Sequence, residues 1–232
     1  MSQQLPLPFG LDPEYTFARF FPGPNAETIR LLQAVALGTA PIPVFLHGPP
    51  GSGKTHLLQA TCGAAGSQGQ LAMTLPLALI KTQGPSAIVG LEEFDCLCLD
   101  DIDVIAGERE WEEALFLLFN ALKDRGAQLV LAAKSPPGQL PFVLEDLRSR
   151  LSSGPTLAMK PLSEQESIQA LIGHASALGL EMSEPVARYL VHRVERDLGS
   201  LIRYLDQLDR ASMAAARRLT IPFVKSIIDP LG

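Results

Sequence analysis

This 232-residue sequence contains a glycine-rich loop at residues 48–55. Its residue types are the ones in the chain best suited to chemistry. It follows an apolar run, 42–47, and precedes a helical pattern that starts at His56. Glycines let backbone N–H groups wrap around phosphate oxygens, Lys54 can reach the outer phosphates, and Thr55 can offer its hydroxyl to Mg²⁺. The new helix adds its positive end. The loop therefore predicts binding of ADP or ATP with Mg²⁺ through Gly48, Pro49, Gly51, Ser52, Gly53, Lys54, Thr55 and His56.

An apolar strand that ends in two acidic residues lies downstream of this loop, at Cys96–Asp101. An acidic pair after a strand is commonly a solvated turn. Behind a phosphate loop, however, Asp100 is placed to hold the water shell of Mg²⁺ and Asp101 to orient an attacking water. The sequence therefore predicts Thr55 and Asp100 as the metal site and Asp101 as a catalytic residue.

Two arginines in the segment 144–151 form a third candidate site. Arg148 and Arg150 fit exposed helix cations that pair with Glu145 or Asp146. They also fit an arginine offered to the γ-phosphate of a neighbouring subunit, which stabilises charge in the transition state. The sequence spacing alone does not decide between a paired surface cation and an arginine offered to a neighbouring subunit.

Composition limits the function classes. Nineteen basic and 25 acidic residues give a formal net charge of −6, which argues against a free-standing duplex DNA binder. The chain has neither a secretory leader nor an apolar run long enough to span a bilayer, so a cytoplasmic protein without membrane contact is expected. Cys62, Cys96 and Cys98 lack the spacing of a metal-binding pair, and we expect buried reduced thiols rather than zinc or a disulfide.

The order of apolar and polar residues predicts three regions. Residues 1–11 alternate prolines with large apolar side chains, so this tail is extended and needs an external groove. Residues 12–160 alternate helical patterns with continuously apolar strands, which indicates an α/β domain whose parallel sheet carries helices on both faces. Residues 161–232 are helical in period and predict a small lid. The expected helices are 25–37, 56–62, 86–91, 110–125, 163–178, 183–195, 198–214 and 221–228, and the expected strands are 44–47, 71–74, 94–99 and 128–133.

The combination of these motifs resembles AAA+ ATPases, and most of all the nucleotide-binding module of the replication initiator DnaA and its regulatory homologues. The resemblance covers nearly the whole chain. The matching segments are the phosphate loop, the acidic strand end, Ser149-Arg150-Leu151, the helical lid, and residues 4–9, 16–23, 135–137, 205–212 and 219–225.

The resemblance implies a partnership. The tail residues Gln4, Leu5, Leu7 and Phe9 would bind the DNA polymerase III sliding clamp (β subunit), so the chain would reach DNA indirectly, without the DNA-binding domain of DnaA. Arg150 would be a finger that promotes hydrolysis of DnaA-bound ATP and so represses re-initiation. Residues 17–25 would lie near the adenine. A homo-oligomer is left open.

Two departures from the family pattern bear on turnover. Lys134-Ser135 stands where a polar sensor usually follows the strand, and Gly199 stands where the lid usually has an arginine for the γ-phosphate. These departures favour a nucleotide-binding regulator with weak intrinsic ATPase activity. The alternatives are a DnaA/DnaC-like ATPase acting as a helicase loader or replication motor, and a small-molecule phosphotransferase.

Overall fold

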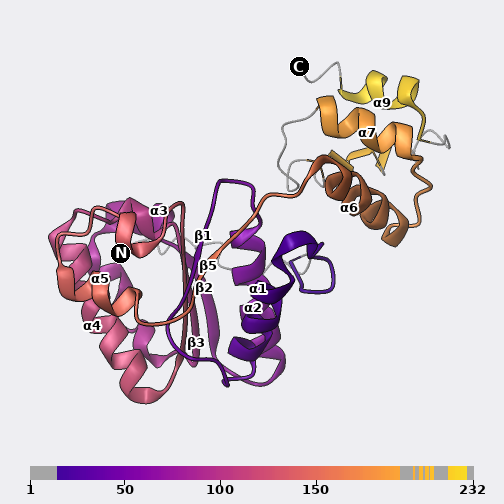
Figure 1. Ribbon diagram of the computed structural model, residues 1–232. Helices are drawn as coiled ribbons and strands as arrows, with labels where there is room; N and C mark the ends of the chain where they lie inside the picture. Colours follow the sequence, from indigo (N-terminus) through magenta and orange to yellow (C-terminus); the bar gives the residue numbers. More distant parts are fainter. Residues whose placement is uncertain are drawn as a thin grey trace, which may run out of the picture. The chain divides into compact units, whose positions relative to one another are not determined.

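The computed structural model describes residues 15–193, 201, 204–205, 207–208, 210–211 and 219–228. The chain divides into two compact units, of which the larger ends at Met159. The larger unit is a sheet covered by helices, and the described part of the smaller unit is helical (Figure 1).

The larger unit is built on five parallel strands in the order β2-β3-β4-β1-β5. The carboxyl ends of parallel strands meet at one edge of a sheet, where ligands of open α/β sheets bind. Since β4 lies between β1 and β3, the residues that follow these three strands are neighbours at that edge. The strands are β1 (Val44–His47), β2 (Ala72–Pro76), β3 (Cys96–Asp100), β4 (Gln128–Ala133) and β5 (Thr156–Ala158).

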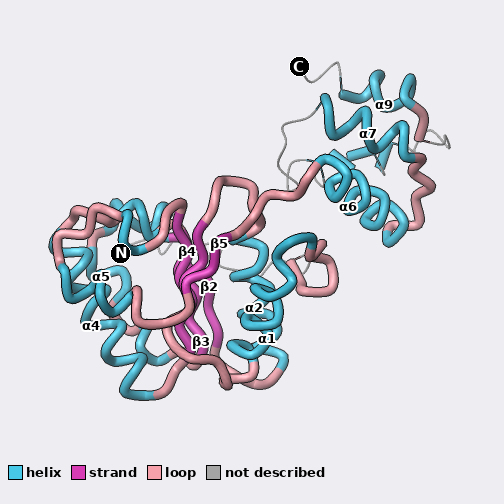
Figure 2. Tube along the Cα trace, viewed as in Figure 1, coloured by secondary structure: helices cyan, strands magenta, loops and turns pink. Residues whose placement is uncertain are grey.

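Helices cover both faces of the sheet, as Figure 2 shows with the strands between two helical layers. Alternate residues of each strand point to opposite faces, so Phe45 packs in one layer and its neighbour Leu46 in the other. One layer contains α1 (Ala26–Ala36) and α2 (Lys54–Ser67), and the other contains α3 (Leu77–Ile80), α4 (Arg109–Arg125) and α5 (Glu145–Leu151). This confirms the predicted α/β fold and explains why the strands are apolar throughout.

The longest described helix, α4, follows its sequence pattern closely. It buries one apolar face and ends where Gly126 adopts φ 69°, in the left-handed region that favours glycine. Trp111 is 3% exposed and belongs to the core. The buried apolar residues of α4 are Trp111, Leu115, Leu118, Phe119 and Leu122.

The smaller unit contains α6 (Glu164–Ala177), α7 (Glu184–Arg193) and α9 (Ile221–Ile228). A capping box starts α6: the Ser163 hydroxyl accepts from the backbone N–H of Glu166, and the Glu166 carboxylate accepts from the backbone N–H of Ser163. Leu171 of α6, Leu190 of α7 and Val224 of α9 are fully buried in one cluster. The predicted helical lid is confirmed.

One local expectation fails, and one strand was not predicted. The helix predicted at 86–91 is instead a pair of 3₁₀ turns, Pro85–Ile88 and Leu91–Glu93, because Gly84 and Gly90 have φ of 84° and 91° and interrupt the chain. The short strand β5 was not predicted, since its three residues carry no strand pattern and it is defined by pairing with β1. Further 3₁₀ turns span Gly23–Asn25, Lys81–Gln83, Ile102–Val104 and Pro137–Gln139. Among the described residues, no helix is both long and apolar enough to cross a membrane.

Candidate functional site

The glycine-rich loop connects β1 to α2 and places Lys54 at the first position of that helix. The Lys54 ammonium donates to the carbonyl oxygens of Gly48, at 2.8 Å, and Pro49, at 3.0 Å. Gly51 and Gly53 have φ of 73° and 90°, which other residues rarely adopt, so the turn of the loop depends on them. Among the described residues, the buried Ser52 hydroxyl has no hydrogen-bond partner, so it is available to a phosphate oxygen.

The second predicted pair, Thr55 and Asp100, is brought together by the fold. The Thr55 hydroxyl donates to Oδ2 of Asp100 at 2.6 Å, and Oδ1 of Asp100 accepts from the backbone N–H of Asp101 at 2.9 Å. Mg²⁺ prefers oxygen ligands and is commonly held by one or two carboxylates together with substrate phosphates. A hydroxyl beside a carboxylate at the mouth of the phosphate loop fits that requirement, and these two residues would hold the ion.

Burial sets the electrostatics of this site. Burial raises the pKa of Asp100 above the ordinary 3.8, and repulsion by Asp101 adds to this. Burial also lowers the pKa of Lys54, although attraction to Asp100 and Asp101 opposes the change. The pKa of His47, at the end of β1, is lowered by burial and then by Lys54. A bound phosphate would favour the charged form of Lys54, and a bound cation would favour that of Asp100.

Asp101 turns the chain sharply after β3. Its backbone has φ 57° and ψ 40°, the only left-handed conformation of a non-glycine residue in the described chain. Aspartate tolerates this region better than most residues, and such conformations cluster at functional sites. The turn keeps Asp101 beside Asp100 at the strand end. Its assignment as the residue that orients water stays a prediction.

The structure also gives the register at the end of β4, where the sensor position falls. Ala133 pairs with His47 of β1, so Lys134 is the first residue beyond the strand and Ser135 the second. The Lys134 ammonium lies 3.3 Å from Oδ2 of Asp103, and its backbone N–H donates to Oδ1 of Asp103 at 3.2 Å. A lysine held by a carboxylate therefore occupies the position next to the phosphate loop.

His56 contacts the segment that precedes α1. Its Nε2 lies 2.9 Å from the carbonyl oxygen of Thr16, and its ring lies 5.0 Å from the ring of Tyr15 and 5.1 Å from that of Phe20. His56 thereby joins the start of α2 to the segment that resembles the adenine-binding stretch. Its assignment to the nucleotide stays a prediction.

The two candidate arginines lie on the same short helix but in different environments. Arg148 pairs with Glu145 at 3.0 Å. Arg150 is half-buried, its guanidinium carbon lies 5.7 Å from the ring centre of Phe116, and it forms no ion pair within the described residues. Both arginines are half-buried, so pairing is what separates them: the interpretation of a paired helix cation fits Arg148, whereas no carboxylate among the described residues compensates the charge of Arg150.

Sequence reasoning missed Glu112, which holds the start of the arginine-bearing helix. This carboxylate is 0% exposed. Its Oε1 accepts from the backbone N–H groups of Gly107 at 2.7 Å and Val143 at 3.2 Å, and its Oε2 accepts from that of Leu144 at 2.7 Å. Leu144 is the N-cap of α5. A signal was present, because Glu112 stands in line with the apolar positions 115, 119 and 122 of α4, where a charge needs buried partners.

Several predicted residues lie outside the described residues. These are the tail positions Gln4, Leu5, Leu7 and Phe9, and the lid position Gly199.

The sheet, the phosphate loop, the acidic strand end and the helical second unit together define the AAA+ class of P-loop proteins. A model of the bacterial DnaA ATPase domain matches residues 11–73 and 82–158, and a model of the lid domain of Hda matches residues 164–228. The first match alone covers more than half of the chain. The chain therefore belongs to the DnaA ATPase-domain family, as an Hda-like DnaA homologue within AAA+.

Solved structures agree on the fold. Domain III of DnaA from Thermotoga maritima is 23% identical, with 95% of this chain and 98% of that chain covered at a TM-score of 0.79. AMPPCP-bound DnaA from Aquifex aeolicus is 24% identical, with 85% of this chain and 66% of that chain covered at a TM-score of 0.72. The Holliday junction branch migration motor RuvB from Thermotoga maritima is 19% identical, with 95% and 73% covered at a TM-score of 0.69.

Proposed function

We propose that this chain is a cytoplasmic regulator that, tethered to the DNA-loaded sliding clamp, promotes hydrolysis of DnaA-bound ATP and so represses re-initiation of replication. Two family matches support the proposal: a DnaA-type ATPase domain allows packing beside DnaA itself, and the lid is of the Hda type. The single observation that carries it is the environment of Arg150.

Arg150 has the properties that a finger acting on a neighbour requires. Within the described residues its guanidinium has no carboxylate partner, and it rests against Phe116, which limits its rotamers. Its helix, α5, lies in the helical layer opposite α2, the helix that starts at Lys54 (Figure 1). A cation placed in this way is available to phosphates that belong to another protein.

The chain's own nucleotide would be ADP or ATP, bound with Mg²⁺. The loop amides, Ser52 and Lys54 would hold the phosphates, while Thr55 and Asp100 would hold the cation. Mg²⁺ neutralises phosphate charge when bound. We expect weak intrinsic turnover, because Lys134 and Gly199 replace residues that active family members use.

The tail supplies the clamp contact. Leu7 and Phe9 are large apolar residues between prolines, and burying each in a groove stabilises a complex by about 1.5–3 kcal/mol. Replacing both with alanine should abolish clamp binding and leave nucleotide affinity unchanged. Co-purification of this double variant with DNA-loaded clamp would contradict the tether.

The test of the finger is single-turnover hydrolysis of radiolabelled ATP pre-bound to DnaA, with clamp and DNA present. Arg150→Ala should lose the stimulation, which for a supplied arginine is about 10³–10⁵-fold. Arg150→Lys should rescue poorly, since lysine lacks the planar fork. Arg148→Ala is the matched control and should retain most activity. Wild-type stimulation by Arg150→Ala would eliminate the role.

Turnover by the isolated chain separates the alternatives. A helicase loader or motor would hydrolyse its own ATP rapidly, and a phosphotransferase would consume ATP only with an acceptor. The proposed regulator should show slow hydrolysis alone and fast hydrolysis only when DnaA, clamp and DNA are added.

A further inference from the structure

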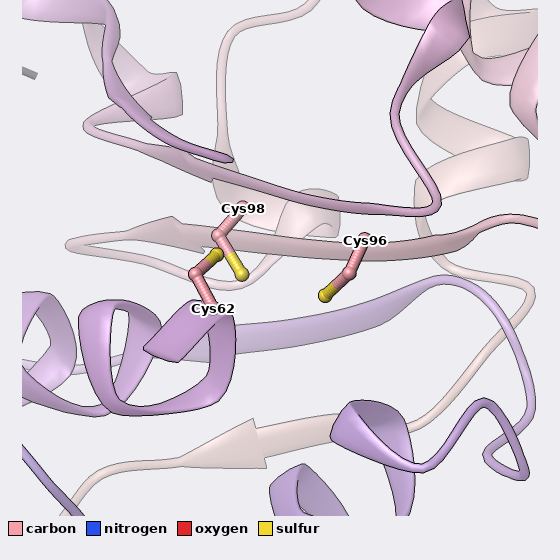
Figure 3. Close-up of side chains that lie close together, drawn as sticks. All are labelled: Cys62, Cys96 and Cys98. Atoms are coloured by element: carbon pink, nitrogen blue, oxygen red, sulfur yellow. The ribbon is translucent and has the colours of Figure 1, made fainter. Parts of the chain in front are cut away.

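All three cysteines of the chain lie together inside the larger unit. Cys62 comes from α2, whereas Cys96 and Cys98 come from β3 (Figure 3). Their Sγ atoms all lie within 4.8 Å of one another, and each side chain is 0% exposed. Three soft sulfur ligands therefore lie close together in the core.

The fold brings these residues together from distant parts of the sequence. Cys96 and Cys98 are two residues apart on a strand, so both point to the same face of the sheet. That face is covered by α2, which presents Cys62 from its third turn. The cluster thus lies between the helix that starts at Lys54 and the strand that ends at Asp100.

A disulfide between the two strand cysteines does not suit this geometry. Cys96 and Cys98 are separated by about 6.6 Å along the strand with parallel side chains, whereas a disulfide needs Cβ atoms about 3.5–4.5 Å apart. Zinc does not suit it either, because structural zinc takes four protein ligands and the described residues offer three.

The net charge of the bound complex further restricts which ion three thiolates could hold in this core. Apolar side chains such as Leu58, Ala65 and Val130 pack in this layer, and the Thr74 side chain hydrogen-bonds Cys62. The hydrogen bond with Cys62 raises the pKa of Cys96, and the carboxylate of Asp95 raises it further, so this charge does not compensate a further negative charge. Three thiolates around Zn²⁺ would bury one negative charge, and around Cu⁺ two, which is costly in an apolar core. Three thiolates around a trivalent centre are neutral.

We propose that Cys62, Cys96 and Cys98 form a binding site for a trivalent thiophilic metalloid of the arsenite class. Neutral arsenous acid, As(OH)₃, would exchange its three hydroxyl groups for three thiols. Three As–O bonds break and three As–S bonds form. Each thiol proton leaves with a hydroxyl group as water, so three waters are released and no electron is transferred.

Cys62 is placed to react first. Hydrogen bonds from the thiols of Cys96 and Cys98 lower its pKa, whereas burial raises the pKa of Cys98. The thiolate is the reactive form of cysteine. Since all three sulfurs are buried, entry depends on local opening of α2 from the sheet, and binding should be slow.

The experiment uses the full reduced chain with sodium arsenite, followed by native mass spectrometry and near-ultraviolet absorbance from As–S bonds. We expect one arsenic per chain with the loss of three hydrogens. Cys62→Ala and Cys96→Val keep apolar side chains in the core, and each should weaken binding at least about tenfold. Tryptophan fluorescence of Trp111 checks that both variants are folded.

Two further measurements make the result decisive. The chain unfolded in guanidinium should bind arsenite at least about tenfold more weakly than the folded chain, because only the fold gathers the thiols. Zinc added alone should not remain bound through buffer exchange. Absence of arsenic in the folded chain, equal affinity in either variant, or stoichiometric zinc in place of arsenic would overturn the proposal.

Discussion

Replacing Glu112 with glutamine tests how the arginine-bearing helix α5 is held. Glutamine is nearly the same size, so the change removes an acceptor without opening a cavity. In the better orientation of the amide, its single oxygen still accepts hydrogen bonds from the backbone N–H groups of Gly107 and Val143. Its NH₂ group then faces the backbone N–H of Leu144. One hydrogen bond to a charged group, about 1.5–3 kcal/mol, is lost and two become weaker neutral bonds. The expected decrease in the free energy of unfolding is about 2–4 kcal/mol.

The chain's single tryptophan makes this loss measurable in the larger unit alone. Trp111 precedes Glu112 on α4 and is buried, so its fluorescence reports unfolding of this unit during a guanidinium titration. Exposed Glu110 is the matched control, and Glu110→Gln should change stability by no more than about 0.5 kcal/mol. Equal midpoints for Glu112→Gln and Glu110→Gln would refute the reasoning.

The same variant probes the connection to function. Because Glu112 binds the N-cap residue of α5, its loss should loosen the helix that carries Arg150. Under conditions where Glu112→Gln remains folded, we expect weaker stimulation of DnaA-bound ATP hydrolysis with unchanged ADP affinity. Equal decreases in both would indicate general damage instead.

Three further predictions concern single positions. Gly154→Ala should destabilise by about 2 kcal/mol or more in the same titration, because an added Cβ would lie 1.8 Å from the Pro43 carbonyl oxygen, whereas Gly138→Ala has open space and should be nearly neutral. Since burial raises the pKa of Asp100, its ionised form costs stability, so Asp100→Asn should be more stable than wild type at about pH 7 and lose that advantage toward about pH 4; an advantage independent of pH would contradict this. Lys54→Ala should weaken calorimetric ADP binding by about 1.5–3 kcal/mol for each charged hydrogen bond lost, and unchanged affinity would remove the loop assignment.

The parts of the fold predicted from sequence are those with a local cause. Strands β1 and β4 have the predicted bounds, because residues buried on both faces form an uninterrupted apolar run between polar ends. The apolar residues of α4 recur at helical spacing, so this helix could be predicted equally well. In contrast, β5 is defined by a partner strand, and the 3₁₀ turns at 85–93 follow from glycine conformations that override a helical pattern.

The candidate site shows the same division. The phosphate loop and Asp100 are suggested by their own spacing, and the structure brings Thr55 of the loop and Asp100 together as expected. The position of Lys134 depended on the register of β4 against β1, and the partners of Glu112 are backbone groups from two separate loops. The cysteine cluster needed the packing of α2 on β3, which no local pattern encodes.

Arg148 and Arg150 show what the fold adds to an ambiguous sequence. Residues two apart on a helix point in directions about 160° apart, so both cannot face the same partner. In the structure, Arg148 forms an ion pair with Glu145, whereas Arg150 packs against Phe116. Their helix, α5, lies in the layer opposite the helix that starts at Lys54. The helix that starts at Lys54 and the helix that carries Arg150 therefore cover different faces of one sheet. On this arrangement, Lys54→Ala and Arg150→Ala should be separable: the first removes nucleotide binding by this chain, and the second removes only its effect on ATP held by DnaA.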